Sequence, residues 1–225
     1  MEDYTNLFDG EAAAAASTWD KQIASGRYIR GQVFLSAALK SVPRGGYILD
    51  YGCGPGRISA LLARNGFCVL GLDPSPGMLA AARQQNLDGL NVEFQGCSFA
   101  PEELPPGAFD GVVCSSVIEY APDPGLFLRS LSAALRPSGV LLISFANSLS
   151  VPRVWDPLRV RDSYQAARKH TWSWPRFREL LEANGFTATR PPRYFRTVTD
   201  RIALLRLLAG SRFWGGLGLV IATKK

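Results

Sequence analysis

Short runs of apolar residues alternate with helical patterns through the first part of the chain. The run 47–51 leads into glycines and then into the apolar spacing of a helix over 58–65, which predicts a strand, a tight turn and a helix. Residues 67–73 repeat the strand pattern, and residues 76–85 predict a second helix with Ser75 as its N-cap. Short right-handed connections place two such strands side by side and parallel. Ligands of open α/β sheets bind at the edge formed by the carboxyl ends of the strands.

The same alternation continues toward the C-terminus. Further strands are predicted at 91–95, from residue 109 and at 140–145, helices at 123–135 and 174–184, and two last strands at 186–194 and 217–223 with an amphipathic helix at 200–209 between them. Residues 17–41 predict one or two helices, and residues 147–171 show no clear period. Because the pattern contains no internal repeat and no sign of a second domain, we expect one α/β domain over residues 1–225.

Three glycines at alternate positions follow the first strand. Gly52, Gly54 and Gly56 place no side chains over the crest of the turn and can adopt positive φ, so a ligand can lie directly against the backbone. The helix that follows would offer its free N–H groups at the same place. A dinucleotide-binding turn needs the spacing G-x-G-x-x-G, whose last glycine would fall at Arg57. The spacing therefore argues against a nicotinamide oxidoreductase.

The composition is that of an ordinary globular domain. The chain has 225 residues, of which 47% are hydrophobic and 20% charged, and this length allows one sizeable core. The acidic start, Met1 to Tyr4, does not have the pattern of a secretory signal, and no apolar run reaches the length needed to span a bilayer. These features predict a soluble, cytoplasmic protein.

The net charge of +6 is unevenly distributed along the chain. Residues 151–225 contain 15 Lys and Arg against 5 Asp and Glu, whereas residues 1–150 contain 10 against 14. A basic third of this kind suggests a substrate with a carboxylate or phosphate, a carrier domain, an anionic membrane surface or nucleic acid. A solvated, arginine-rich surface is an equally good explanation.

The cysteines do not have the spacing of a metal site. Cys53, Cys68, Cys97 and Cys114 contain no C-x-x-C pair, and a single histidine accompanies them. A cysteine in or beside an apolar strand usually acts as a small hydrophobic residue. We therefore expect neither a bound metal nor a disulfide framework.

Several motifs occur in an order that is typical of one family. Asp50 precedes the G-x-G-x-G turn, Asp73 ends the second strand, and the segments 109–120 and 131–143 read as a fourth strand with its loop and as a helix, turn and fifth strand. Over residues 45–148 the chain resembles the class I S-adenosylmethionine-dependent methyltransferases, in the small-molecule group that includes ubiquinone and menaquinone biosynthesis enzymes. The resemblance implies an α/β, Rossmann-like fold with a mostly parallel seven-stranded sheet, an antiparallel last strand and helices on both faces.

The resemblance also divides the chain into three parts. Residues 1–44 correspond to a helical segment that often closes over the cofactor in this family, residues 45–148 to the cofactor-binding core, and residues 149–225 to a substrate-side insertion and the C-terminal strands. The candidates for lid residues are Trp19, Tyr28 and Arg30. Core packing is the alternative role for an aromatic residue on a helix face.

Methyl transfer from a sulfonium is an in-line displacement, so the main tasks of such an enzyme are to hold the donor and to aim the nucleophile. A carboxylate at Asp73 can accept both ribose hydroxyls, and the resemblance places Asp50 near the amino end of the methionine moiety and Met78 against the adenine. The family commonly has an acidic residue for the adenine amino group where this chain has Cys97. The predicted cofactor-binding residues are Asp50, Gly52, Cys53, Gly54, Gly56, Asp73, Pro74, Met78, Cys97, Ser98 and Ser115.

Tyr120 and His170 are the candidates for catalysis on the acceptor. Tyr120 stands where many small-molecule members have a histidine as general base, so either Tyr120 takes a positioning role or the acceptor needs no base. His170 is the one histidine of the chain, and the resemblance implies that it could act as a base, since a histidine just before this helix recurs in the family. A hydrogen-bonded structural role is the alternative for His170. We expect a small-molecule acceptor, with an anionic group held by arginines as one option.

Other interpretations stay open. Nucleic-acid methylation would explain the basic C-terminal third, but base amino-methyltransferases usually carry a Pro-Pro-aromatic motif where this chain has Ser115 to Ile118. A non-catalytic module that binds S-adenosylmethionine would explain the absence of the family's histidine and acidic residue. The basic, leucine-rich helix 201–208 could lie on a membrane surface, or pack against the sheet or another subunit. The sequence does not predict the oligomeric state.

Overall fold

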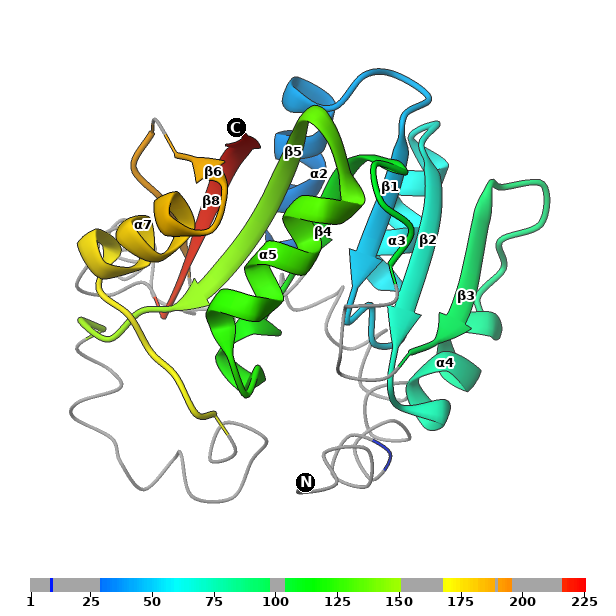
Figure 1. Cartoon of the computed structure of the whole chain (residues 1–225). Coiled ribbons are helices and arrows are strands. Elements are labelled where there is room, and N and C mark those ends of the chain that lie inside the picture. The colour runs from blue at the N-terminus through cyan, green and yellow to red at the C-terminus, as the bar shows by residue number, and fades with distance from the viewer. Residues whose placement is uncertain (1–8, 10–28, 98–103, 151–167, 189, 196–215) are drawn as a thin grey trace, which may run out of the picture.

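The computed structural model of the protein describes residues 9, 29–97, 104–150, 168–188, 190–195 and 216–225 (Figure 1). The predicted amphipathic helix 200–209, which contains the basic, leucine-rich segment 201–208, lies outside these residues. So do Trp19, Tyr28 and most of the predicted substrate-side insertion. Among the helices in the described part, none is long and apolar enough to cross a membrane.

A mixed β-sheet forms the centre of the molecule (Figure 1). Its strands are β1 Tyr47–Tyr51, β2 Cys68–Asp73, β3 Val92–Gly96, β4 Phe109–Cys114, β5 Leu135–Ala146, β6 Phe186–Thr187, β7 Arg193–Phe195 and β8 Leu217–Lys224. They follow the order β3-β2-β1-β4-β5-β8-β6, and β7 also pairs with β8. The strands β1 to β5 are parallel, and β8 is antiparallel to β5. The predicted α/β fold with an antiparallel last strand is confirmed.

Helices cover both faces of the sheet. They are α2 Ile29–Ser41, α3 Arg57–Arg64, α4 Pro76–Arg83, α5 Pro124–Ala134 and α7 Trp174–Ala183, with a short 3-10 helix η2 at Ile118–Tyr120. In Figure 1, α5 and α7 lie in front of the sheet and α2 and α3 behind it. The two apolar cores alternate along each strand: Leu49 and Tyr51 of β1 face the α5 and α7 side, whereas Ile48 faces α2 and α3. Strands buried on both faces explain the nearly continuous apolar runs in the sequence.

The helix α2 belongs to the core. Val33, Phe34 and Ala38 are buried and pack with Leu62 of α3 and Ile48 of β1. This part of the predicted N-terminal lid is therefore a sheet-covering helix. The residues before it lie outside the described part except for Asp9, so a lid formed by them stays a prediction.

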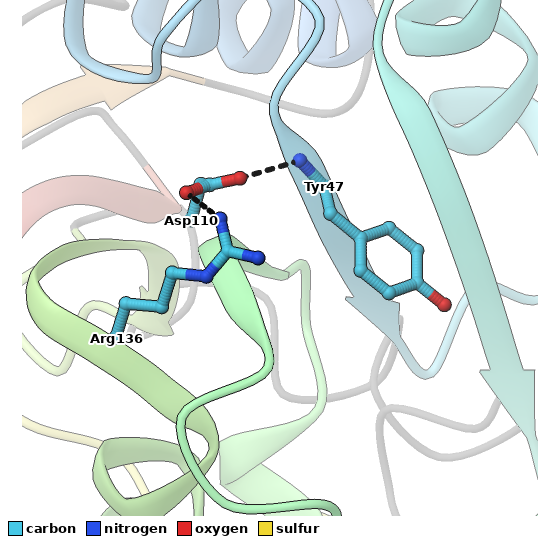
Figure 2. A network of polar contacts seen from close by, with 3 residues as sticks. All are labelled: Tyr47, Asp110 and Arg136. Atoms are coloured by element: carbon cyan, nitrogen blue, oxygen red, sulfur yellow. Dashed lines mark hydrogen bonds and ion pairs between the residues drawn. The ribbon is translucent and has the colours of Figure 1, made fainter.

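Asp110 joins three strands at the edge opposite to the predicted site. Its Oδ2 accepts a hydrogen bond from the Tyr47 N–H at 2.8 Å, and its Oδ1 pairs with Arg136 Nη1 at 2.5 Å (Figure 2). Strand β5 begins at Leu135, earlier than the predicted residue 140, and four residues bulge between its pairings with Phe109 and Gly111. The ion pair from Asp110 holds this bulge, where the sequence had predicted a turn.

The predicted strand 186–194 consists of two short strands instead, which raises the number of strands in the described sheet from the predicted seven to eight. Phe186 and Thr187 pair with one end of β8, and pairing resumes at Arg193 after residues 188–192. Pro191 and Pro192 lie in this interruption. Proline has no N–H to donate to a neighbouring strand, which explains why the strand breaks here.

Candidate functional site

The turn between β1 and α3 has the backbone conformation that its glycines predict. Gly52, Gly54 and Gly56 have φ values of 71°, 54° and 71°, all in the left-handed region. The N–H groups of Gly52 and Cys53 both donate to the Leu72 carbonyl, at 2.7 and 2.9 Å. These bonds hold the turn against the end of β2. Residues other than glycine would be strained at such φ values, which explains why the turn contains glycines.

The three glycines differ in what lies over them. A Cβ on Gly52 would lie 2.3 Å from Val117 Cγ2, and one on Gly56 would lie 2.6 Å from Phe94 Cζ. A Cβ on Gly54 would meet no atom of the described residues within 4 Å. The outer glycines therefore allow close packing inside the protein, whereas the middle glycine faces open space at the carboxyl edge of the sheet. Such an open cradle over exposed backbone suits a bound ligand.

Asp73 lies beside this cradle with its carboxylate held in place. Its Oδ2 accepts the Gly54 N–H at 2.7 Å, and its Oδ1 accepts the Ser75 N–H at 2.9 Å. Burial raises the pKa of the Asp73 carboxyl, and these two N–H groups lower it. Each carboxylate oxygen keeps a second lone pair for a ligand hydroxyl.

Asp50 is a second carboxyl group, buried where β1 meets the turn. Ser59 Oγ donates to Asp50 Oδ2 at 2.6 Å, and both residues are almost completely buried. Burial raises the pKa of Asp50 to about 7, with the Ser59 hydrogen bond opposing this effect and the Asp73 charge adding to it. A cation bound at this edge would favour the ionised form of both carboxyl groups. The role of Ser59 was not predicted.

The other predicted cofactor residues in the described part of the chain lie in the glycine turn, in α4 and next to the ends of β2 and β3. Met78 is buried in α4, whose N-cap is Ser75 as predicted, and Cys53 is buried beside the turn. The Cys97 N–H donates to the Asp73 carbonyl at 3.4 Å. Burial raises the pKa of the Cys97 thiol to about 11, the Asp73 charge adds to this, and contact with the Tyr51 hydroxyl opposes it. Ser98 lies outside the described residues, and Pro74 is partly buried next to Asp73.

Two serines follow β4 at the same edge. The Oγ atoms of Ser115 and Ser116 are buried and have no hydrogen-bond partner in the described part of the chain. Ser116 has a left-handed backbone, with φ 59°, and its N–H donates to Ser144 Oγ at 2.9 Å. A buried hydroxyl without a partner is costly, so the two serines are candidates to bind a ligand. Both serines directly follow the predicted fourth strand, and Ser115 is among the predicted cofactor-binding residues.

The structure brings His170 to the loop after β4. The N–H groups of Lys169 and His170 donate to the Glu119 carbonyl at 2.9 and 3.1 Å, and His170 Nε2 lies 3.1 Å from the Ala121 carbonyl. A carbonyl can only accept, so Nε2 carries the hydrogen and Nδ1 of the neutral ring is an acceptor. The fully buried Glu119 also pairs with Arg168, at 4.0 Å between Oε1 and Nε.

Tyr120, the other catalytic candidate, is 2% exposed within η2. It lies in the same loop as the carbonyl groups that hold His170, so the structure brings the two candidates together. Its role stays a prediction. In the described residues, no group of three or more His, Cys, Asp or Glu side chains could hold a metal ion.

Comparison with known proteins identifies the family. Residues 24–190 match the family model described as a methyltransferase domain. The chain belongs to this methyltransferase family. Among curated relatives, the ubiquinone biosynthesis O-methyltransferase of Xanthomonas axonopodis is 36% identical over 118 residues, which are 51% of this chain and 48% of the relative. The chain thus spans about half the length of the curated relatives it matches.

Solved structures share the methyltransferase fold. An S-adenosylmethionine-dependent methyltransferase from Mesorhizobium loti superposes with a TM-score of 0.66 and 25% identity, over 84% of this chain and 95% of that one. A 1,6-didemethyltoxoflavin-N1-methyltransferase from Burkholderia thailandensis, solved with S-adenosylhomocysteine, has a TM-score of 0.64 and 22% identity, over 99% and 89% of the two chains.

The different surroundings of the glycines predict different losses of stability. Gly54→Ala should lower the free energy of unfolding by about 1–2 kcal/mol, because only the left-handed φ is strained. Gly52→Ala should cost about 1–3 kcal/mol more, since its new methyl group overlaps Val117. Urea unfolding of both variants measures the difference. Equal losses would contradict the open cradle at Gly54.

The raised pKa of Asp50 predicts a dependence of stability on pH. The folded-state pKa of about 7 exceeds the ordinary 3.8, so the stability linked to this proton is complete below pH 4 and is lost as the pH rises to 7. Asp50→Asn should therefore gain on the order of 4 kcal/mol relative to the unaltered protein between pH 4 and 8. Urea unfolding across this range tests it, with the exposed Asp88→Asn as the matched control. A difference independent of pH would contradict the assignment.

Proposed function

We propose that this protein transfers a methyl group from S-adenosylmethionine to the hydroxyl group of a small molecule. The observation that carries the proposal is the open backbone cradle at Gly54 beside the fixed carboxylate of Asp73. The family assignment and the curated O-methyltransferase relative support it. When bound, the donor supplies a methyl group on a positively charged sulfur.

In this proposal the residues of the turn and of β2 hold the donor. Asp73 binds the ribose hydroxyls through the lone pairs that Gly54 and Ser75 leave free. Asp50, near the same edge, balances the positive charge of the methionine moiety, and Met78 packs against the adenine. Cys97 is a neutral thiol with a raised pKa, so it offers the adenine no carboxylate acceptor. In the described part of the chain, the proposed donor site thus comprises the glycine turn with Cys53, Asp50, Asp73, Pro74, Met78, Cys97 and Ser115.

The acceptor would lie between Ser115 and His170. His170 Nδ1 would take the proton of the acceptor hydroxyl, and a bound donor would supply the methyl group to that oxygen. The Ala121 carbonyl fixes the tautomer in which Nδ1 is free to accept. The excess of arginine and lysine in residues 151–225 would suit an acceptor with a carboxylate or phosphate.

Donor binding is the first test. Calorimetric titration should detect binding of S-adenosylmethionine and S-adenosylhomocysteine but not of NAD. Asp73→Ala should weaken donor binding by about 1.5–3 kcal/mol, the usual range for hydrogen bonds to a charged group. Asp88→Ala, which removes an exposed carboxylate in the turn between α4 and β3, should bind normally. An unchanged affinity in Asp73→Ala would overturn the ribose assignment.

Replacement of His170 tests the acceptor chemistry. Turnover should first be screened with aromatic and sugar hydroxyl acceptors, with and without a carboxylate. His170→Ala should then lower kcat by about 10²–10⁴-fold, the usual contribution of a general base. Its melting temperature and its affinity for S-adenosylhomocysteine should stay unchanged. A loss of stability with normal turnover would instead support the structural role.

A further inference from the structure

Asp9 reaches the N-terminus of α4 from a distant part of the sequence. Its Oδ1 accepts hydrogen bonds from Ser75 Oγ and, at 2.9 Å, from the Gly77 N–H. Ser75 and Gly77 lie 66 and 68 positions further along the chain. Asp9 thus contacts the helix that follows Asp73, although no motif in the sequence singled it out.

The contact completes the capping of α4. The first helical residue, Pro76, has no N–H, and the N–H groups of Met78 and Leu79 donate to Ser75 Oγ and to the Ser75 carbonyl at 3.1 Å each. The Gly77 N–H is the remaining donor of the first turn, and Asp9 accepts it. Residues near the helix in sequence leave this donor unpaired, so the carboxylate of Asp9 has a specific role here.

Ser75 links Asp9 to the candidate donor site. The Ser75 side chain donates to Asp9, while its backbone N–H donates to Asp73 Oδ1 at 2.9 Å. Ser75 is fully buried, and Asp73 is 7% exposed. The other oxygen of Asp73 accepts the Gly54 N–H. A continuous series of hydrogen bonds therefore runs from Asp9 through Ser75 and Asp73 to the glycine turn.

The two carboxylates also influence each other electrostatically. Burial raises the pKa of Asp73, the N–H groups of Ser75 and Gly54 lower it, and the negative charge of Asp9 raises it again. The positive end of α4 offsets part of this repulsion. The charge of Asp9 so close to Asp73 is electrostatically unfavourable. The hydrogen bonds that Asp9 accepts would compensate for this cost by ordering the site.

We propose that Asp9 is a positioning residue of the donor site, which acts through Ser75 on the orientation of Asp73. The inference rests on the proposed function, because it assigns to Asp9 an effect on donor affinity. By reciprocity, a bound donor would strengthen the contact between Asp9 and α4 by the same factor. Asp9 itself does not contact the donor in this proposal.

The test is calorimetric titration of the full chain with S-adenosylhomocysteine. Asp9→Ala should weaken binding about 5- to 10-fold, the loss expected for one hydrogen-bonding contact. Asp9→Asn keeps the oxygen that accepts both hydrogen bonds and should bind within about threefold of the unaltered protein. Asp88→Ala is the matched control and should bind normally.

A double-mutant cycle separates positioning from simple helix capping. In an Asp73→Asn background, Asp9→Ala should weaken binding by less than about twofold further, because the effect passes through Asp73. Independent, multiplicative losses would overturn the proposal, as would a lower melting temperature with unchanged affinity. Asp9→Asn as weak as Asp9→Ala would also overturn it. If the unaltered protein bound no S-adenosylhomocysteine, the proposed function would fail first, and this inference with it.

Discussion

The hydrogen bond from the Gly54 N–H to the Asp73 carboxylate joins the two strand ends on which the candidate site depends. At 2.7 Å it connects the turn after β1 with the end of β2. It forms because β1 and β2 are parallel neighbours, with Tyr51 opposite Leu72. The backbone of the turn can approach the carboxylate because Gly52 and Gly56 adopt left-handed φ values and pack tightly against Val117 and Phe94. The turn therefore packs closely against the protein at Gly52 and Gly56, whereas no described atom covers Gly54.

Two buried carboxyl groups at one edge are unfavourable without compensation. The two carboxyl groups have different hydrogen-bond partners. Asp73 accepts two backbone N–H groups, whereas Asp50 accepts one hydroxyl from Ser59 and has a pKa raised to about 7 by burial. Both would be better satisfied beside a positive charge. The electrostatics of these two carboxyl groups thus agree with a cationic ligand, which is what the proposed methyl donor would be.

The proposed acceptor side depends on a different kind of contact. Two backbone N–H groups, of Lys169 and His170, donate to the Glu119 carbonyl, and the His170 side chain donates to the Ala121 carbonyl. These bonds attach the segment at His170 to the loop after β4. Glu119 is fully buried, and its pairing with Arg168 compensates part of the cost of burying the charge. Such pairs often add little stability but can fix one arrangement of a site. This arrangement attaches His170 to the loop after β4, at the carboxyl edge of the sheet where Ser115 and Ser116 lie.

Local patterns in the sequence determined most of the helices and strands, and they predict the donor side of the proposed site. The glycine spacing, the acidic residues at strand ends and the Ser75–Pro76 cap are all contained in short segments, and the chemistry of each follows from its immediate neighbours. Predicted boundaries differ mainly where distant residues intervene. The pairing of Leu135 with Phe109 starts β5 earlier than predicted, and Pro191 and Pro192 divide the predicted strand 186–194 into β6 and β7.

Only the tertiary structure decided which residues support the site. Ser59 beneath Asp50, Ser144 behind Ser116 and Asp9 at the start of α4 each act across gaps in the sequence that no period or motif spans. The same is true of α2, whose apolar face reads equally well as a lid or as core until its contacts with α3 are known. A sequence pattern shows that a side chain is apolar or can form hydrogen bonds. The partner it meets depends on how the sheet is assembled, because that alone brings distant segments within hydrogen-bonding distance.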